Sequence, residues 1–83
     1  MYLNKPLLRF FLFVEISMKI ILNGESLETV EGASVETVLK QLGISRERVA
    51  VELNTDIVPK ADYEKQLLSD GDKIEIVHFV GGG

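Results

Sequence analysis

The chain has 83 residues and a net charge of −4, and it contains no cysteine, no tryptophan and one histidine. This length allows one small domain with a limited core, and the lack of cysteine excludes disulfides, thiolate metal sites and a nucleophilic thiol. The acidic balance argues against nucleic acid or an anionic membrane as the main partner, and it suits either docking on a basic protein surface or simple solubility.

The first seventeen residues differ in composition from the rest. Residues 7–14 are apolar except for one arginine, but this run is shorter than the roughly 20 residues that span a bilayer. Glu15 follows directly, and no small-residue cleavage site of a signal peptide is present. Because Met18 resembles a natural protein start, we expect residues 1–17 to be an extension, most simply a misassigned start, and residues 18–83 to be the domain. The alternatives are an added strand or helix over an apolar surface, or a weakly membrane-associating segment.

Residues 19–22 and 25–30 are predicted to form a β-hairpin. The dipeptide Asn23-Gly24 lies between two strand-forming runs. It is the strongest short hairpin signal, because a type I′ turn needs a positive φ at both central residues.

Residues 35–42 are predicted to form the main helix. Ser34 is a suitable N-cap. Gly43 can end the helix in a left-handed conformation, with Ile44 packing back on Leu39. One apolar stripe has the spacing i, i+3, i+4, i+7 and consists of Val35, Val38, Leu39 and Leu42. Two turns are too short to be stable alone, so this helix must pack on a sheet.

Three more strands are expected after the helix. Residues 49–53 alternate with period two, residues 54–56 form a turn, and residues 57–58 form a brief strand. Pro59 confines that strand to an edge, because proline cannot donate a hydrogen bond to a neighbouring strand. Residues 73–80 form the last strand.

The connection before the last strand is expected to be partly helical. Residues 61–67 form a helical turn or short helix that packs through Tyr63, Leu67 and Leu68. Residues 70–72, Asp-Gly-Asp, form a tight turn. A turn explains these two carboxylates more simply than a metal site does, so no metal ligands are predicted.

This order of elements indicates an α+β fold, in which a mixed sheet of four to five strands packs on one main helix. The last strand should lie centrally beside the first, because Ile74 and Ile76 match its core-facing pattern. Alternation also places His78 on that face, half-buried or at the edge, rather than in a catalytic role. The opposite face would expose Val77 and Phe79 as a small docking patch, unless residues outside the sheet cover it.

The sequence closes on Gly81, Gly82 and Gly83 directly after an apolar strand. Glycine lacks a Cβ, so such a tail can enter a channel that excludes bulkier residues. Three extended residues reach roughly 10 Å, far enough to bring the Gly83 carboxylate into a partner's active site. A frayed terminus or a cloning scar is the alternative.

Over residues 18–83 the sequence resembles the ThiS family of sulfur carrier proteins of thiamin biosynthesis, which have the ubiquitin-like β-grasp fold. The matching stretches are residues 21–24, residues 51–54, residues 57–59, the Asp-Gly-Asp turn and the closing residues 74–83. Residues 1–17 match nothing in the family pattern.

The resemblance implies a cytoplasmic protein that is not an enzyme and binds no cofactor of its own. The Gly83 carboxylate would be adenylated with ATP and magnesium by a ThiF-like adenylating enzyme and converted to a thiocarboxylate. That group would then donate sulfur to a ThiG-like thiazole synthase, the sulfur coming from a donor such as a cysteine desulfurase relay. The residues that the resemblance implies bind these partners are Val77, Phe79, Val80, Gly81 and Gly82. No nucleic acid or membrane partner is implied.

Three other functions share some of these features. The small subunit of molybdopterin synthase also ends in Gly-Gly, although it tends to be longer, and a ubiquitin-like modifier would be attached to lysines. A plain interaction module would not need its terminal glycines.

Overall fold

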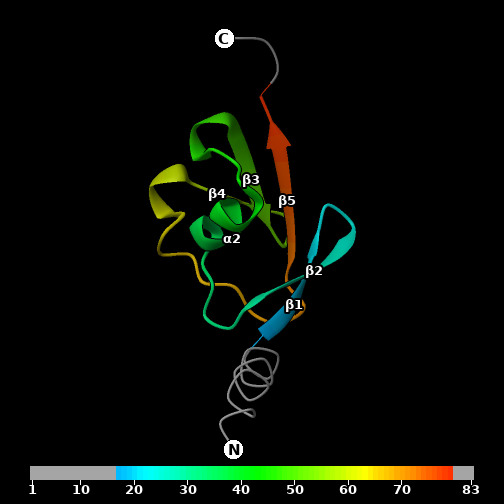
Figure 1. Cartoon of the computed structure of the whole chain (residues 1–83). Helices are drawn as coiled ribbons and strands as arrows, with labels where there is room; N and C mark the ends of the chain where they lie inside the picture. The colour runs from blue at the N-terminus through cyan, green and yellow to red at the C-terminus, as the bar shows by residue number, and fades with distance from the viewer. Residues whose placement is uncertain (1–16, 80–83) are drawn as a thin grey trace, which may run out of the picture.

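The structure is a computed structural model that describes residues 17–79. Its strands are β1 (Ser17–Leu22), β2 (Glu25–Val30), β3 (Val49–Leu53), β4 (Asp56–Val58) and β5 (Lys73–His78). The α-helix is α2 (Val35–Leu42), and two 3₁₀ turns are η1 (Arg46–Arg48) and η2 (Lys60–Asp62). Figure 1 shows α2 lying across the sheet, with β5 running up to the last described residues.

The five strands form one mixed sheet in the order β2-β1-β5-β3-β4. β5 is parallel to β1 and antiparallel to β3, and the two outer pairs are antiparallel. The predicted α+β architecture and the central position of the last strand are confirmed. β4 lies at an edge, as the proline after it requires.

Both hairpin turns contain an asparagine with a positive φ. Asn23 (φ 48°) and Gly24 (φ 87°) connect β1 to β2, as predicted, with Leu22 opposite Glu25. Asn54 (φ 51°) and Thr55 (φ 79°) connect β3 to β4 in the same way.

β1 begins at Ser17, two residues earlier than predicted. Ser17 pairs with Val30, and Met18 pairs with Thr29 and is buried. Ser17 is therefore part of the sheet, although the sequence pattern assigns it to the extension. Residues 1–16 lie outside the described part of the chain.

The helix has the predicted bounds and both predicted caps. The Ser34 hydroxyl accepts a hydrogen bond from the Thr37 amide at 3.1 Å, and the Thr37 hydroxyl accepts one from the Ser34 amide. At the other end Gly43 (φ 71°) donates to the Lys40 carbonyl, and Ile44 donates to the Leu39 carbonyl at 2.9 Å. This is the Schellman arrangement.

The core lies between α2 and the sheet face that α2 covers, here called the inner face. The largest fully buried side chains are Tyr63, Ile20, Leu39, Ile74, Val35, Val38, Val49 and Val51. Ile76 and Leu68 are also buried. One contiguous core thus forms along the predicted apolar stripes.

One sequence prediction is wrong in this region. Of the two forms predicted for residues 61–67, a helical turn or a short helix, the structure has the turn, η2, but Leu67 is 60% exposed and does not pack in the core. Leu67 forms an extended bridge with Ser34, and because alternate residues of extended chain point in opposite directions, Leu68 is buried instead. His78 is exposed at the end of β5, which is the second of the two predicted positions, half-buried or at the edge.

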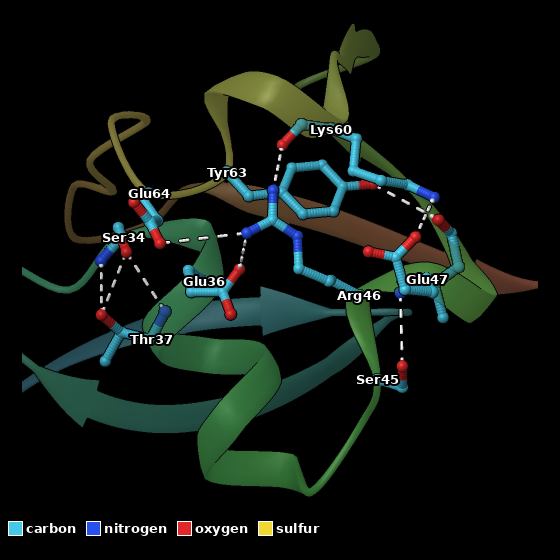
Figure 2. A network of polar contacts seen from close by, with 10 residues as sticks. Ser34, Glu36, Thr37, Ser45, Arg46, Glu47, Lys60, Tyr63 and Glu64 are labelled. Carbon is cyan, nitrogen blue, oxygen red and sulfur yellow. Dashed lines mark hydrogen bonds and ion pairs between the residues drawn. The ribbon is translucent and has the colours of Figure 1, made fainter.

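The guanidinium of Arg46 joins η1 to η2 and α2 (Figure 2). It donates to the Lys60 carbonyl at 2.6 Å, lies 3.3 Å from the buried Glu36 Oε1 as an ion pair without hydrogen-bond geometry, and sits 5.5 Å from the Tyr63 ring centroid. The Tyr63 hydroxyl donates to the Val49 carbonyl at 3.3 Å. These contacts fix the irregular segments onto β3.

Asparagine side chains from both hairpin turns bind the main chain of β5. The Asn23 Oδ1 accepts from the Ile76 amide at 2.8 Å, and its Nδ2 donates to the Ile76 carbonyl at 3.2 Å. The Asn54 Oδ1 accepts from the Lys73 amide at 2.9 Å. Asn23 therefore continues the pairing of β5 beyond the end of β1.

We expect Asn23→Gly to lower the free energy of unfolding by about 1–3 kcal/mol, because it removes two hydrogen bonds and keeps a residue suited to positive φ. Asn23→Ala should cost roughly 1–2 kcal/mol more, from the left-handed backbone. Urea unfolding of both variants tests this, and a glycine variant as stable as the parent would contradict the role of the amide.

Burial raises the pKa of the Tyr63 phenol, partly opposed by the Arg46 cation. A raised folded-state pKa means that the stability due to protonated Tyr63 is complete below the unfolded pKa of about 10 and is lost as pH rises through the folded value. The parent should therefore lose stability above pH 10 more steeply than Tyr63→Phe, which should already be about 1 kcal/mol less stable at pH 7. Parallel pH curves from urea unfolding would contradict this.

Candidate functional site

The root of the glycine tail is held by β3. Val77 pairs with Ala50, His78 pairs with Val49, and the Phe79 amide donates to the Arg48 carbonyl at 2.9 Å. Phe79 is the last described residue. The predicted site residues Val80, Gly81, Gly82 and Gly83 lie outside the described part of the chain.

The predicted patch residues Val77 and Phe79 are each 58% exposed. Val77 alternates with the buried Ile76, so it lies on the outer face, the sheet side opposite α2. Phe79 follows with the same parity. Their predicted exposure is confirmed for residues 17–79, and their role in partner binding stays a prediction.

Ile57 extends this apolar surface, and the sequence reasoning missed it. It is 73% exposed, pairs with Glu52 in β3 and alternates with the buried Val58. The alternation of a strand could have identified it. Neighbouring residues of a strand point to opposite sides, so Ile57 must face outward when Val58 faces the core.

A cation lies at the root of the tail. The Nζ of Lys60 is 5.9 Å from the centroid of the Phe79 ring and 3.5 Å from Glu47 Oε1. Such a cation–π contact at an exposed site contributes about 0.5–1 kcal/mol. It favours one position of the Phe79 ring, at the point where the tail begins.

The Asp70 and Asp72 carboxylates both serve the turn before β5. Asp70 Oδ1 accepts from the Lys19 amide at 2.8 Å, and Asp72 accepts from the Ser69 amide at 2.7 Å and from Asn54 Nδ2 at 3.0 Å. Within residues 17–79 no group of three or more His, Cys, Asp or Glu side chains could hold a metal ion. No helix in the same range has the length and hydrophobicity to cross a membrane.

Comparison with known proteins gives one consistent result. The sequence model of the ThiS family matches residues 20–83. A sulfur carrier protein ThiS of Bacillus subtilis is 38% identical over 63 residues, which are 75% of this chain and 96% of that protein. The crystal structure of the thiamine biosynthesis protein ThiS from Geobacter metallireducens has a TM-score of 0.65 and 34% identity, covering 80% of this chain and 100% of that one.

A longer relative also matches. A thiazole synthase of Paramagnetospirillum magneticum is 47% identical over 66 residues, which are 80% of this chain. The match spans only 20% of that protein's length.

A matched pair of substitutions tests whether the Val77 side chain contributes to the stability of the fold. Val77→Thr should change the free energy of unfolding by less than about 0.5 kcal/mol, as at other exposed positions. Val51→Thr buries a hydroxyl at a position that is 1% exposed and should cost about 1–3 kcal/mol. Equal losses in thermal or urea unfolding would mean that something covers Val77.

Proposed function

The chain belongs to the ThiS family, and from this membership we propose that it is a sulfur carrier protein of thiamin biosynthesis, active in thiazole formation. The folded body catalyses no reaction in this proposal. It acts as a co-substrate, and its reacting group is the carboxylate of Gly83.

The proposed chemistry solves a leaving-group problem. A carboxylate is a poor acyl donor, because its leaving group would be oxide. When a Gly83 oxygen attacks the α-phosphorus of ATP, pyrophosphate leaves and an acyl-adenylate forms. A sulfur nucleophile then attacks the acyl carbon and AMP leaves; with hydrosulfide the products are a thiocarboxylate, AMP and a proton. The enzymes that bind ATP, magnesium and the sulfur donor supply the catalytic groups.

One observation carries the proposal. The central strand β5 ends at an exposed surface, and the sequence after Phe79 is Val80 followed by three glycines. A tail attached there starts from a fixed point and has no side chains after Val80 to obstruct entry into an active site. The exposed Val77 and Phe79 beside it are the proposed docking contacts for partners.

The proposed partners act at successive steps of this chemistry. A ThiF-like adenylating enzyme activates the carboxylate, a relay such as a cysteine desulfurase supplies sulfur, and a thiazole synthase accepts it. The match within a thiazole synthase of Paramagnetospirillum magneticum supports the last of these. Since activation consumes ATP, we place the carrier in the cytoplasm.

Incubation of the chain with ATP, a ThiF-like adenylating enzyme and a sulfur source should replace one terminal oxygen by sulfur. Intact-mass spectrometry should detect the corresponding increase, and fragmentation should place it on Gly83. An unchanged mass under conditions that convert a known ThiS protein would contradict the proposal.

Deletion of Gly82 and Gly83 supplies the control. The truncated chain should keep the melting temperature of the parent and lose all conversion. Retained function in the truncated chain would favour an interaction module whose glycines are incidental.

A further inference from the structure

The three residues of η1 each contact either Lys60 or Phe79, so this turn joins η2 to the root of the tail. The Arg46 guanidinium donates to the Lys60 carbonyl at 2.6 Å, and Glu47 Oε1 lies 3.5 Å from the Lys60 Nζ (Figure 2). The Arg48 carbonyl accepts from the Phe79 amide at 2.9 Å. η1 therefore holds both ends of Lys60 and the main chain of Phe79.

Lys60 completes this arrangement, because its ammonium lies 5.9 Å from the centroid of the Phe79 ring. Phe79 is consequently held at two points, its amide by Arg48 and its ring by Lys60. The rotamers open to a side chain depend on the φ and ψ of its own residue. A contact that favours one position of the ring therefore also favours one direction for the main chain that leaves Phe79.

We propose that Lys60 is a positioning residue for the activation of Gly83. It acts through the Phe79 ring, which it holds in the position that the adenylating enzyme binds. Glu47 contributes by keeping the Lys60 ammonium near that ring. This inference rests on the proposed function and assigns a part in it to a residue that neither reacts nor belongs to the tail.

The advantage of a held ring is a matter of populations. Phe79 is 58% exposed, and an exposed side chain without such a contact exchanges among rotamers within nanoseconds. A partner that binds one rotamer has an apparent affinity reduced to the fraction of molecules that hold it. An exposed cation–π contact changes such an equilibrium by roughly two- to fivefold, which is the largest gain in affinity that Lys60 can supply in this way.

The test measures adenylation kinetics of Lys60→Met and Lys60→Arg with a purified ThiF-like enzyme that converts the parent chain. We expect the KM for the carrier to rise roughly two- to fivefold in Lys60→Met with kcat unchanged. Lys60→Arg should keep most of the affinity, because a guanidinium also binds an aromatic face. The hydrogen bond from Arg46 goes to the Lys60 main chain and is available in both variants.

Lys65→Met is the matched control. Lys65 is exposed in the segment after η2, and its ammonium has no ion pair or hydrogen bond among the described residues. This substitution changes the net charge by the same amount as Lys60→Met and should leave KM as in the parent.

A double-mutant cycle with Phe79→Leu separates action through the ring from direct contact with the enzyme. In the Phe79→Leu background, Lys60→Met should have no further effect on KM, because no ring is left to hold. Additive losses would mean that Lys60 itself contacts the enzyme, and they would overturn the inference.

Solution NMR of the free chain gives a readout that involves no enzyme. The ring current should shift the Lys60 ε-methylene protons upfield in the parent. Three-bond couplings of Phe79 should show one χ1 rotamer more populated in the parent and in Lys65→Met than in Lys60→Met.

Equal rotamer populations in the parent and Lys60→Met, an unchanged KM in Lys60→Met, or an equal rise in Lys65→Met would contradict the role of Lys60. Failure of the parent chain to be adenylated at all would instead contradict the proposed function.

Discussion

Main-chain hydrogen bonding on both edges of β5 is the constraint on which the rest of the structure depends. Every residue of β3 pairs with one edge of β5. Along the other edge of β5, only its first two residues pair with β1. Where β1 has ended, the Asn23 side chain takes its place by bonding both polar atoms of the Ile76 main chain. Asn54 binds the start of β5 in the other turn. The last strand is thereby held by hydrogen bonds on both of its edges.

In the proposed function, this constraint would let a small domain present its reacting group from a fixed point. Phe79 follows β5 directly and its amide donates to the Arg48 carbonyl, so the sheet fixes the position of the residue that precedes Val80 and the three glycines. The contacts of Arg46 and Tyr63 hold η1 and η2 against β3, and η2 brings Lys60 to the Phe79 ring. In the proposed function, body and tail would divide the work: partners would recognise the body, and the tail would react.

Local sequence signals predicted most of this architecture. The Asn-Gly turn, the Ser34 and Gly43 caps, and the alternation in β3 and β5 are short-range patterns whose physical cause lies within a few residues. They yielded both hairpin strands, the helix and the central position of the last strand. The exposure of Val77 followed from the same alternation.

The errors arose where long-range contacts decide. Leu67 is exposed because its segment pairs with Ser34, and Ser17 is in the sheet because Val30 lies opposite it. Neither contact leaves a trace in the adjacent sequence. The Arg46 contacts and the opposition of Glu52 to Glu75 likewise depend on strand register, which the sequence alone did not supply.

The central claim is that one carboxylate, at the end of the tail, is the reacting group. ATP–pyrophosphate exchange by the adenylating enzyme, measured with the native chain and with a chain whose Gly83 carboxylate is converted to an amide, tests it most directly. The amide removes the reacting oxygen and leaves the fold and docking surface unchanged. We predict exchange with the native chain and none with the amidated chain, and equal exchange with both would contradict the account.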